Sequence, residues 1–264
     1  MNMTESAATR SGRGLPSPLL ALEFLTVLRV RRPPLATATE VARAQLWYPL
    51  VGLAIGLLVA GLDALLQPRL PALPEAAILI AILAGLTGFL HLDGLADCAD
   101  GLLGLHAPEK RLDIMRDSRI GAFGAVAIAL DLLLLWSALA TLSGPARGAT
   151  IALAPTLGRA AMIVVAFFPN AHPGGLASGF REAARGPYGL GALLLAALIA
   201  AGALGAGGLA LGGVALAIGL AVAVLAWLRL RGVTGDVFGA ACELAQAGVL
   251  LCACAWQGWL RPWL

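Results

Sequence analysis

Three aspartates follow an apolar stretch of the chain at spacings of four and three residues: Asp93, Asp97 and Asp100. On a helix this spacing puts the three carboxylates, the acidic row, on one face, where like charges repel one another. Each acidic side chain near membrane depth costs about 2.5–3.5 kcal/mol, so three together need a cation. Hard carboxylate oxygens favour Mg²⁺, with Mn²⁺ or Ca²⁺ as substitutes, and Mg²⁺ takes further ligands from water and substrate phosphates. The alternative is a solvated acidic helix end, but no lysine or arginine interrupts residues 70–109.

Two arginines, Arg116 and Arg119, lie just before the next apolar stretch, with Asp117 and Ser118 between them. If they share one side of a helix, each planar guanidinium group can donate two hydrogen bonds to the oxygens of a phosphate. Gly121 leaves the entrance to the following helix uncrowded. Both arginines would also serve as cytoplasmic membrane anchors, but an anchor needs neither the aspartate nor the serine. Together with the acidic row, this segment predicts a diphosphate site in which Ser118 and Gly121 bind the substrate.

Four further residues are candidates for the same site. His91 precedes the acidic row by two residues, and its type fits either a structural hydrogen bond or a substrate contact. Arg159 is a cation inside an apolar stretch, which we expect to contact the substrate or, alternatively, to pair with a structural acid. Asp236 and Glu243, seven residues apart, share a helical face. Asp236 could equally cap a helix, whereas Glu243 inside an apolar stretch needs a functional reason.

The composition indicates which elements must position these residues. The chain has 264 residues, of which 59% are hydrophobic and 12% charged, about half the usual charged share. Its mean hydropathy is +0.87, which predicts an all-α, polytopic membrane protein with one catalytic domain over residues 1–264. About seven apolar segments are long enough to cross a bilayer. These predicted crossings are residues 45–67, 73–90, 121–142, 147–168, 188–210, 212–230 and 237–257.

The N-terminal 44 residues are expected to form a cytosolic tail that includes an interfacial helix. The apolar stretch over 15–30 carries Glu23 and runs into basic residues, which makes it a poor signal peptide and too short to span. Most basic residues fall on one side of the predicted topology, so the N-terminus and the loop over 91–120 should face the cytoplasm. The same residues are scattered rather than gathered into a stripe, which argues against a nucleic-acid partner.

These segments resemble the cobalamin synthase family, and the resemblance covers most of the chain. One departure is Cys98, where family members often carry threonine, and it leaves the acidic row unchanged. The resemblance rests on residues 24–28 (FLTVL), 48–52 (YPLVG), 91–101 (HLDGLADCADG), 115–119 (MRDSR) with Gly121, Gly158-Arg159, and 234–243 (TGDVFGAACE).

The resemblance implies a Mg²⁺-dependent transferase of the last steps of vitamin B12 synthesis. In that reaction α-ribazole, or its 5′-phosphate, displaces GMP from adenosylcobinamide-GDP. The resemblance also implies a multi-pass protein of the bacterial inner membrane whose active site faces the cytoplasm. The sequence allows a homo-oligomer and leaves open which of the two acceptors is used.

The residue chemistry agrees with such a transfer, because phosphoryl transfer needs charge neutralisation and in-line positioning more than covalent help. The acidic row would hold Mg²⁺ against the diphosphate, while Arg116 and Arg119 stabilise charge on the departing GMP. Either Asp100 or Glu243 would accept the proton of the nucleophile, and the sequence does not choose between them.

Two other functions remain as alternatives. A CDP-alcohol phosphotransferase of phospholipid synthesis also gathers aspartates around divalent metals at a membrane face. Its pattern has Ala-Arg after the first Asp-Gly, whereas Gly94 is followed by Leu-Ala-Asp. A cation-coupled transporter would place carboxylates near the middle of the membrane and show inverted repeats, which this sequence lacks.

Overall fold

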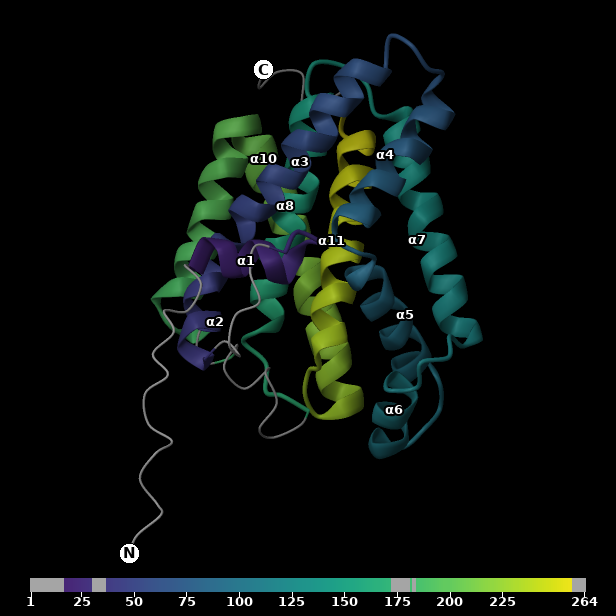
Figure 1. Ribbon diagram of the computed structural model, residues 1–264, viewed down its shortest axis with the longest axis vertical. Helices are drawn as coiled ribbons and strands as arrows, with labels where there is room; N and C mark the ends of the chain where they lie inside the picture. The colour runs from purple at the N-terminus through teal and green to yellow at the C-terminus, as the bar shows by residue number, and fades with distance from the viewer. Residues whose placement is uncertain (1–16, 30–36, 172–180, 182–183, 258–264) are drawn as a thin grey trace, which may run out of the picture.

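The computed structural model describes residues 17–29, 37–171, 181 and 184–257. Within these ranges the regular structure is helical, apart from an isolated β-bridge between Asn170 and Val233, so the all-α prediction is confirmed. Figure 1 shows a bundle of long helices. The elements are α1 (Ser17–Leu25), α2 (Ala38–Ala44), η1 (Gln45–Trp47), α3 (Tyr48–Leu66), α4 (Ala72–Leu86), α5 (Leu90–Leu103), α6 (Pro108–Met115), α7 (Ala122–Thr141), α8 (Arg147–Val165), α10 (Pro187–Leu230) and α11 (Gly235–Ala255).

Five helical segments are long and apolar enough to cross a membrane, which confirms the prediction of a polytopic membrane protein. They are Gln45–Leu66, Ala122–Thr141, Arg147–Val165, Pro187–Leu230 and Gly235–Ala255. Helices α4 and α5 are bent by 89° and pass the same test only together, so they give a sixth crossing if the pair is counted as one span.

The 44-residue helix α10 is two helices joined by a sharp reversal. Leu204 and Gly205 leave the helical region, and Gly205 has φ 55°, a left-handed backbone that suits glycine. Beyond this break, Gly208 lies directly against the backbone of Ala200. A straight helix would separate these two residues by about 12 Å. The two halves therefore lie against each other as a hairpin, where the sequence predicts two crossings, residues 188–210 and 212–230; the break falls at Leu204 and Gly205 rather than near residue 211.

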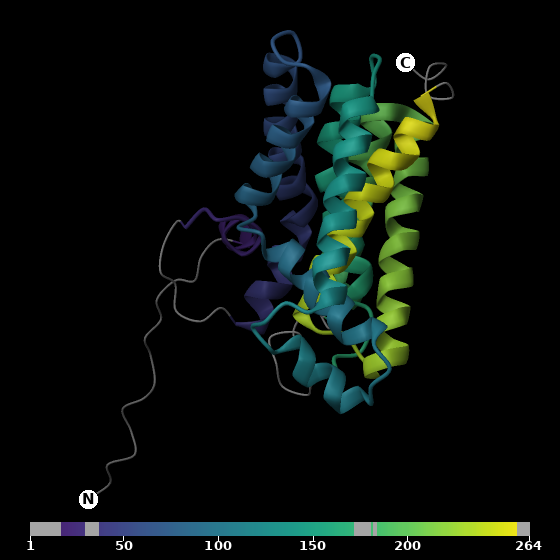
Figure 2. The ribbon, with the colours of Figure 1, turned by 90° about the vertical axis from the view of Figure 1, so that its right-hand side faces the viewer.

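Helix α8 is the centre of the bundle. It packs against α3, α10 and α11, and 83% of its apolar stretch is buried, compared with 28% for α7. Helix α1 lies across the bundle rather than along it, since it is seen from the side in Figure 1 and end-on in Figure 2. The ring of Phe24 on α1 stacks on Tyr48 of α3, with the ring centres 6.1 Å apart. A short N-terminal helix lying crosswise fits the predicted interfacial helix.

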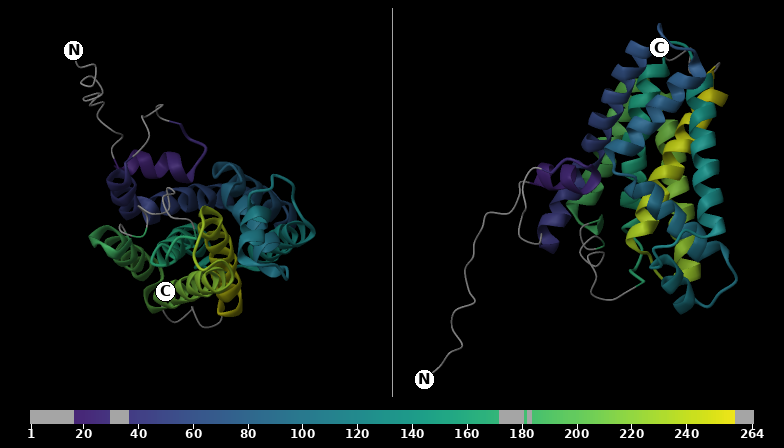
Figure 3. Two further views of the ribbon diagram at one scale, coloured as in Figure 1. Left: turned by 90° about the horizontal axis from the view of Figure 1, so that it is seen from below. Right: turned by 45° about the vertical axis from the view of Figure 1, so that its right-hand side comes forward.

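The two ends of the bundle differ in chemistry. One end, the α6 end, holds α6 and the starts of α7 and α11 (Figures 1 and 3). At the opposite end, Arg147 forms an ion pair with Asp63, with Nη2 and Oδ1 2.6 Å apart, and its Nη2 lies 3.4 Å from Glu75 Oε1. All three side chains are buried. Arg147 is therefore the centre of a buried ion-pair group at this end.

The segment over 91–120, expected as a loop, is largely helical, and its cytoplasmic side remains a prediction. That segment holds α5, which packs against α11 and α7, and then α6. The predicted crossing over 73–90 ends at Leu86, because Gly88 and Phe89 both adopt left-handed backbone angles, φ 61° and 60°. These two residues turn the chain by the 89° that separates α4 from α5.

Candidate active site

The acidic row lies where α5 crosses α11, and two glycines let the helices touch. A Cβ atom on Gly94 would lie 2.7 Å from the carbonyl oxygen of Asp236, and one on Gly239 would lie 3.1 Å from the Cα of His91. The two backbones are therefore in direct contact at this crossing. The contact puts the start of α11 beside the acidic row of α5.

The crossing gathers four carboxylates, which we call the acidic cluster: Asp93, Asp97, Asp100 and Asp236. The carboxylate of Asp97 interacts electrostatically with the other three, and that of Asp236 also with Asp93. Asp93 is exposed, whereas the others are half-buried. The predicted sharing of one face by the acidic row is thus seen in the structure. Asp236, predicted to bind substrate, lies with the predicted metal ligands.

The acidic cluster has the donor chemistry that a divalent cation requires, since all of its side-chain atoms are hard oxygen ligands. In the described part of the chain, no three such side chains already converge as a complete metal site. A complete protein cage is not required, because Mg²⁺ is usually held by one or two carboxylates together with water and substrate phosphate. The residues therefore fit Mg²⁺ bound together with a phosphorylated substrate.

Asp100 also has a structural role that the sequence did not reveal. Its carboxylate accepts hydrogen bonds from the backbone N–H groups of Gly121 (2.7 Å) and Gly124 (2.9 Å), at the start of α7. It thereby caps a helix that has no capping side chain of its own. A Cβ atom at either glycine would collide with this carboxylate. Gly121, predicted to bind substrate, thus has another role, because its lack of a side chain leaves space for the Asp100 carboxylate.

The arginine pair does not lie on a helix as expected. Helix α6 ends at Met115, so Arg116 is its C-cap and Arg119 lies in the connection to α7. Asp117 bonds the backbone N–H and the side chain of Arg119, with Nη2 and Oδ2 2.6 Å apart. These hydrogen bonds from Arg119 lower the pKa of Asp117 to about 2. Both arginines and Ser118 are exposed at the α6 end, and their contact with phosphate remains a prediction.

His91, Arg159 and Glu243 form a separate buried group between α5, α8 and α11. Arg159 donates from Nη1 to Gln246 Oε1 (3.2 Å), Gln246 donates to Glu243 (3.2 Å), and His91 Nδ1 lies 3.8 Å from Glu243 Oε1. Glu243 lies seven residues beyond Asp236, about 10 Å deeper along α11. His91 and Arg159, for which substrate contacts are predicted, are therefore buried inside the bundle, with 1% and 0% of their surface exposed.

Several polar atoms of this buried group have no hydrogen-bond partner among the described residues. They are both ring nitrogens of His91, Nε and Nη2 of Arg159, and both carboxylate oxygens of the neighbouring Asp131. Buried polar groups are normally hydrogen-bonded, so this group has capacity for ordered water or ligand. Glu243 faces this interior rather than the acidic cluster.

Arg111 is a further residue that the sequence analysis missed. It is 3% exposed, and its guanidinium donates to the carbonyl oxygens of Gly101, Leu102 and His106, each at 2.8 Å. The carbonyls of Gly101 and Leu102 lie in the last turn of α5, where backbone oxygens lack partners within the helix, and that of His106 lies just beyond it. Arg111 therefore fixes the end of the helix that carries the acidic row. A lone arginine eight residues after a helix end gives no local signal of this contact.

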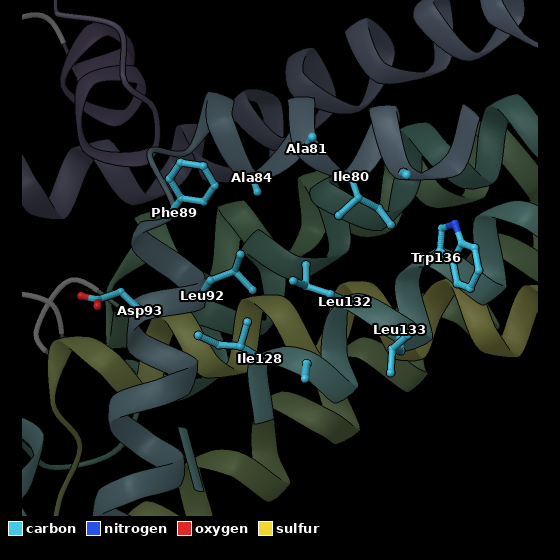
Figure 4. Close-up of a pocket in the computed structure, with 12 residues that line it drawn as sticks. Ile80, Ala81, Ala84, Phe89, Leu92, Asp93, Ile128, Leu132, Leu133 and Trp136 are labelled. Atoms are coloured by element: carbon cyan, nitrogen blue, oxygen red, sulfur yellow. The ribbon is translucent and has the colours of Figure 1, made fainter. Parts of the chain in front are cut away.

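A groove of about 840 Å³ runs between α4, α5 and α7 and reaches the acidic cluster. In Figure 4 it extends from Phe89 and Asp93 at one end to Trp136 at the other, past apolar side chains such as Leu92 and Ile128. Asp93 belongs both to this groove and to the acidic cluster. The site therefore combines a polar part at the α6 end with an apolar part along the membrane-spanning helices.

Comparisons with known proteins agree with the resemblance. The family model of cobalamin-5-phosphate synthase matches residues 17–254. A protein of Ectopseudomonas mendocina (strain ymp) named adenosylcobinamide-GDP ribazoletransferase is 39% identical over 246 residues, 89% of this chain and 97% of the relative. Relatives with the same name from Pseudomonas paraeruginosa (41% identical; 90% and 97% covered) and Desulfitobacterium hafniense (39%; 88% and 94%) match similarly.

No solved structure gives a significant match to this chain. The sequence relatives and the family model alone therefore carry the assignment. They confirm that the chain is an enzyme of the transferase class, and they favour this function over the two alternatives. The match spans nearly the whole described chain, including both helices that bring the acidic cluster together. The chain belongs to the cobalamin-5-phosphate synthase family.

Proposed function

We propose that this protein transfers the adenosylcobinamide phosphate group from adenosylcobinamide-GDP to α-ribazole or its 5′-phosphate, in a Mg²⁺-dependent reaction. The observation that carries the proposal is the acidic cluster at the α5–α11 crossing, in a chain whose relatives are named for this donor. We further propose that the α6 end faces the cytoplasm of a bacterial inner membrane, because exposed basic residues such as Arg116 and Arg119 lie there.

The reaction exchanges one phosphorus–oxygen bond for another. A ribose hydroxyl oxygen of the acceptor attacks the phosphorus atom that carries the cobinamide group. The bond from that phosphorus to the bridging oxygen breaks, GMP leaves with the electron pair, and the hydroxyl proton passes to a base. The chain must therefore hold a diphosphate, position an acceptor opposite the leaving group and receive one proton.

The described residues are suited to these tasks. Asp93, Asp97 and Asp236 would hold Mg²⁺ against the diphosphate, with Asp100 beside them. When bound, Mg²⁺ neutralises charge on the phosphate oxygens. Arg116 and Arg119, exposed at the same end, would bind the phosphate of the leaving GMP. Of the two bases left open, Asp100 lies in the acidic cluster and Glu243 about 10 Å deeper, which favours Asp100.

The test measures GMP release from adenosylcobinamide-GDP by purified protein with α-ribazole and Mg²⁺. We expect Asp97→Asn to reduce the rate at least about a hundredfold, and removal of Mg²⁺ by a chelator to have a similar effect. Without the metal, charge on the phosphate oxygens is not compensated, which raises the barrier. Asp113→Asn on α6 is the matched control, since this exposed aspartate lies outside the acidic cluster and should keep the wild-type rate. Undiminished release by a correctly folded Asp97→Asn protein would refute the role of the acidic cluster.

A further inference from the structure

The groove between α4, α5 and α7 differs from the acidic cluster that it adjoins. Of the described residues that line it, Asp93 alone is charged. Trp136, at the other end, already donates its indole N–H to the carbonyl oxygen of Leu73 (2.8 Å). The groove therefore presents a long apolar surface, and its charged group, Asp93, lies at the end that it shares with the acidic cluster. A suitable occupant is apolar over most of its surface and polar at one end.

The fold holds an aromatic ring at that shared end. Phe89 has φ 60°, which costs a non-glycine residue about 1–2 kcal/mol. Its ring is 58% exposed and lines the groove one helical turn before Asp93. Val27, which follows α1, supports the bend by donating its backbone N–H to the carbonyl oxygen of Leu86 (2.9 Å). A strained backbone position persists where the surrounding structure determines it, and here it presents a ring to the groove.

We propose that the Phe89 end of this groove binds the dimethylbenzimidazole base of the acceptor α-ribazole, with the ribose directed at Asp93. The inference rests on the proposed function, which supplies the identity of the acceptor. The base is a flat, apolar, bicyclic aromatic group, and an offset stack with Phe89 is worth about 0.5–1.5 kcal/mol beyond the burial of its surface. A groove of about 840 Å³ has room for it.

The other large groups of the two substrates do not match this lining. The guanine base of the donor carries hydrogen-bonding groups around its edge, and the corrin ring carries amide side chains. Buried against alanine, leucine and isoleucine, those groups would lose their hydrogen bonds to water without replacement. The base of the acceptor carries a single hydrogen-bond acceptor, its second ring nitrogen, and no donor, so its penalty is much smaller. The groove therefore selects the acceptor and leaves the polar α6 end to the donor.

The test fills the groove beside Phe89. In Figure 4 Ala84 lies next to the Phe89 ring, so Ala84→Trp occupies the space proposed for the base. We expect the KM for α-ribazole to rise about tenfold or more, while the KM for adenosylcobinamide-GDP stays within about twofold, since a blocked pocket loses over 1.4 kcal/mol of binding. The matched control is Ala54→Trp, because Ala54 is exposed on α3 and does not line the groove.

The outcomes separate this inference from the proposed function. If the wild-type protein releases no GMP with either acceptor, the proposed function fails. If the wild type is active and Ala84→Trp leaves the KM for α-ribazole unchanged, the groove inference fails. It also fails if the variant changes only the amount of co-purifying phospholipid, which would make the groove a lipid site. Should Ala84→Trp not fold, Ala84→Val and equilibrium dialysis with α-ribazole give the same comparison of affinity.

Discussion

Replacing Asp100 by asparagine tests whether this carboxylate holds the start of α7. The carboxylate accepts hydrogen bonds from two backbone N–H groups, Gly121 at 2.7 Å and Gly124 at 2.9 Å. Asparagine keeps the shape but offers one oxygen, and its amide N–H₂ then faces one of the two donors. A charge-assisted hydrogen bond contributes about 1.5–3 kcal/mol, so we expect Asp100→Asn to lower the free energy of unfolding by roughly 2 kcal/mol. A loss of this size lowers the unfolding temperature by roughly 4–8 °C.

Thermal unfolding in detergent, followed by tryptophan fluorescence, measures this effect. The matched variant is Asp93→Asn, because Asp93 is the exposed member of the acidic row. We expect Asp93→Asn to reduce GMP release without lowering the unfolding temperature, since it relieves repulsion between carboxylates. Asp100→Asn should lower both. An Asp100→Asn protein that unfolds at the wild-type temperature would show that the carboxylate does not cap α7, and the argument from its two hydrogen bonds would fail.

Three further substitutions test other contacts. Gly94→Ala places a Cβ atom 2.7 Å from a backbone oxygen of α11, so it should cost about 1–3 kcal/mol and slow GMP release, whereas Gly85→Ala, with nothing within 4 Å, should do neither. Arg147→Met leaves Asp63 without its buried partner and should cost about 3–5 kcal/mol in the same unfolding assay; a smaller loss than Gly94→Ala would contradict the buried ion pair. Arg111→Met frees three carbonyl oxygens at the end of α5, and should cost roughly 2–4 kcal/mol and speed amide hydrogen exchange there; unchanged exchange would count against this contact.

The membrane-spanning architecture could be predicted because it depends on local properties of the chain. A crossing needs about 20 apolar residues, and the predicted segments meet that requirement within their own windows, except for 73–90, which ends at Leu86. The sharing of one face by the acidic row follows from helical periodicity alone. The reversal in α10 was harder to predict, because Leu204 and Gly205 interrupt an apolar run that continues on both sides.

The parts of the site that depend on contacts between distant residues could not be predicted. Asp236 joins the acidic cluster only because Gly94 lies against α11, more than 140 positions away along the chain. The segment that carries the acidic row also gives no local indication that the other face of α5 packs against α11 and α7. The prediction that the two arginines share a helix was wrong for a local reason, since α6 ends at Met115 and Asp117 accepts a hydrogen bond from the backbone N–H of Arg119.

The burial of Arg159 at the centre of α8 constrains how the protein is made. A segment with a fully buried arginine has the lowest mean hydropathy of the five long spans, 1.5, and would enter lipid poorly as a solitary helix. Its side-chain partner, Gln246, is synthesised much later, on α11. We therefore expect α8 to reach its final place only once α11 has been made and can pack against it. Truncated chains that end before α11 should accordingly be substrates for membrane quality control.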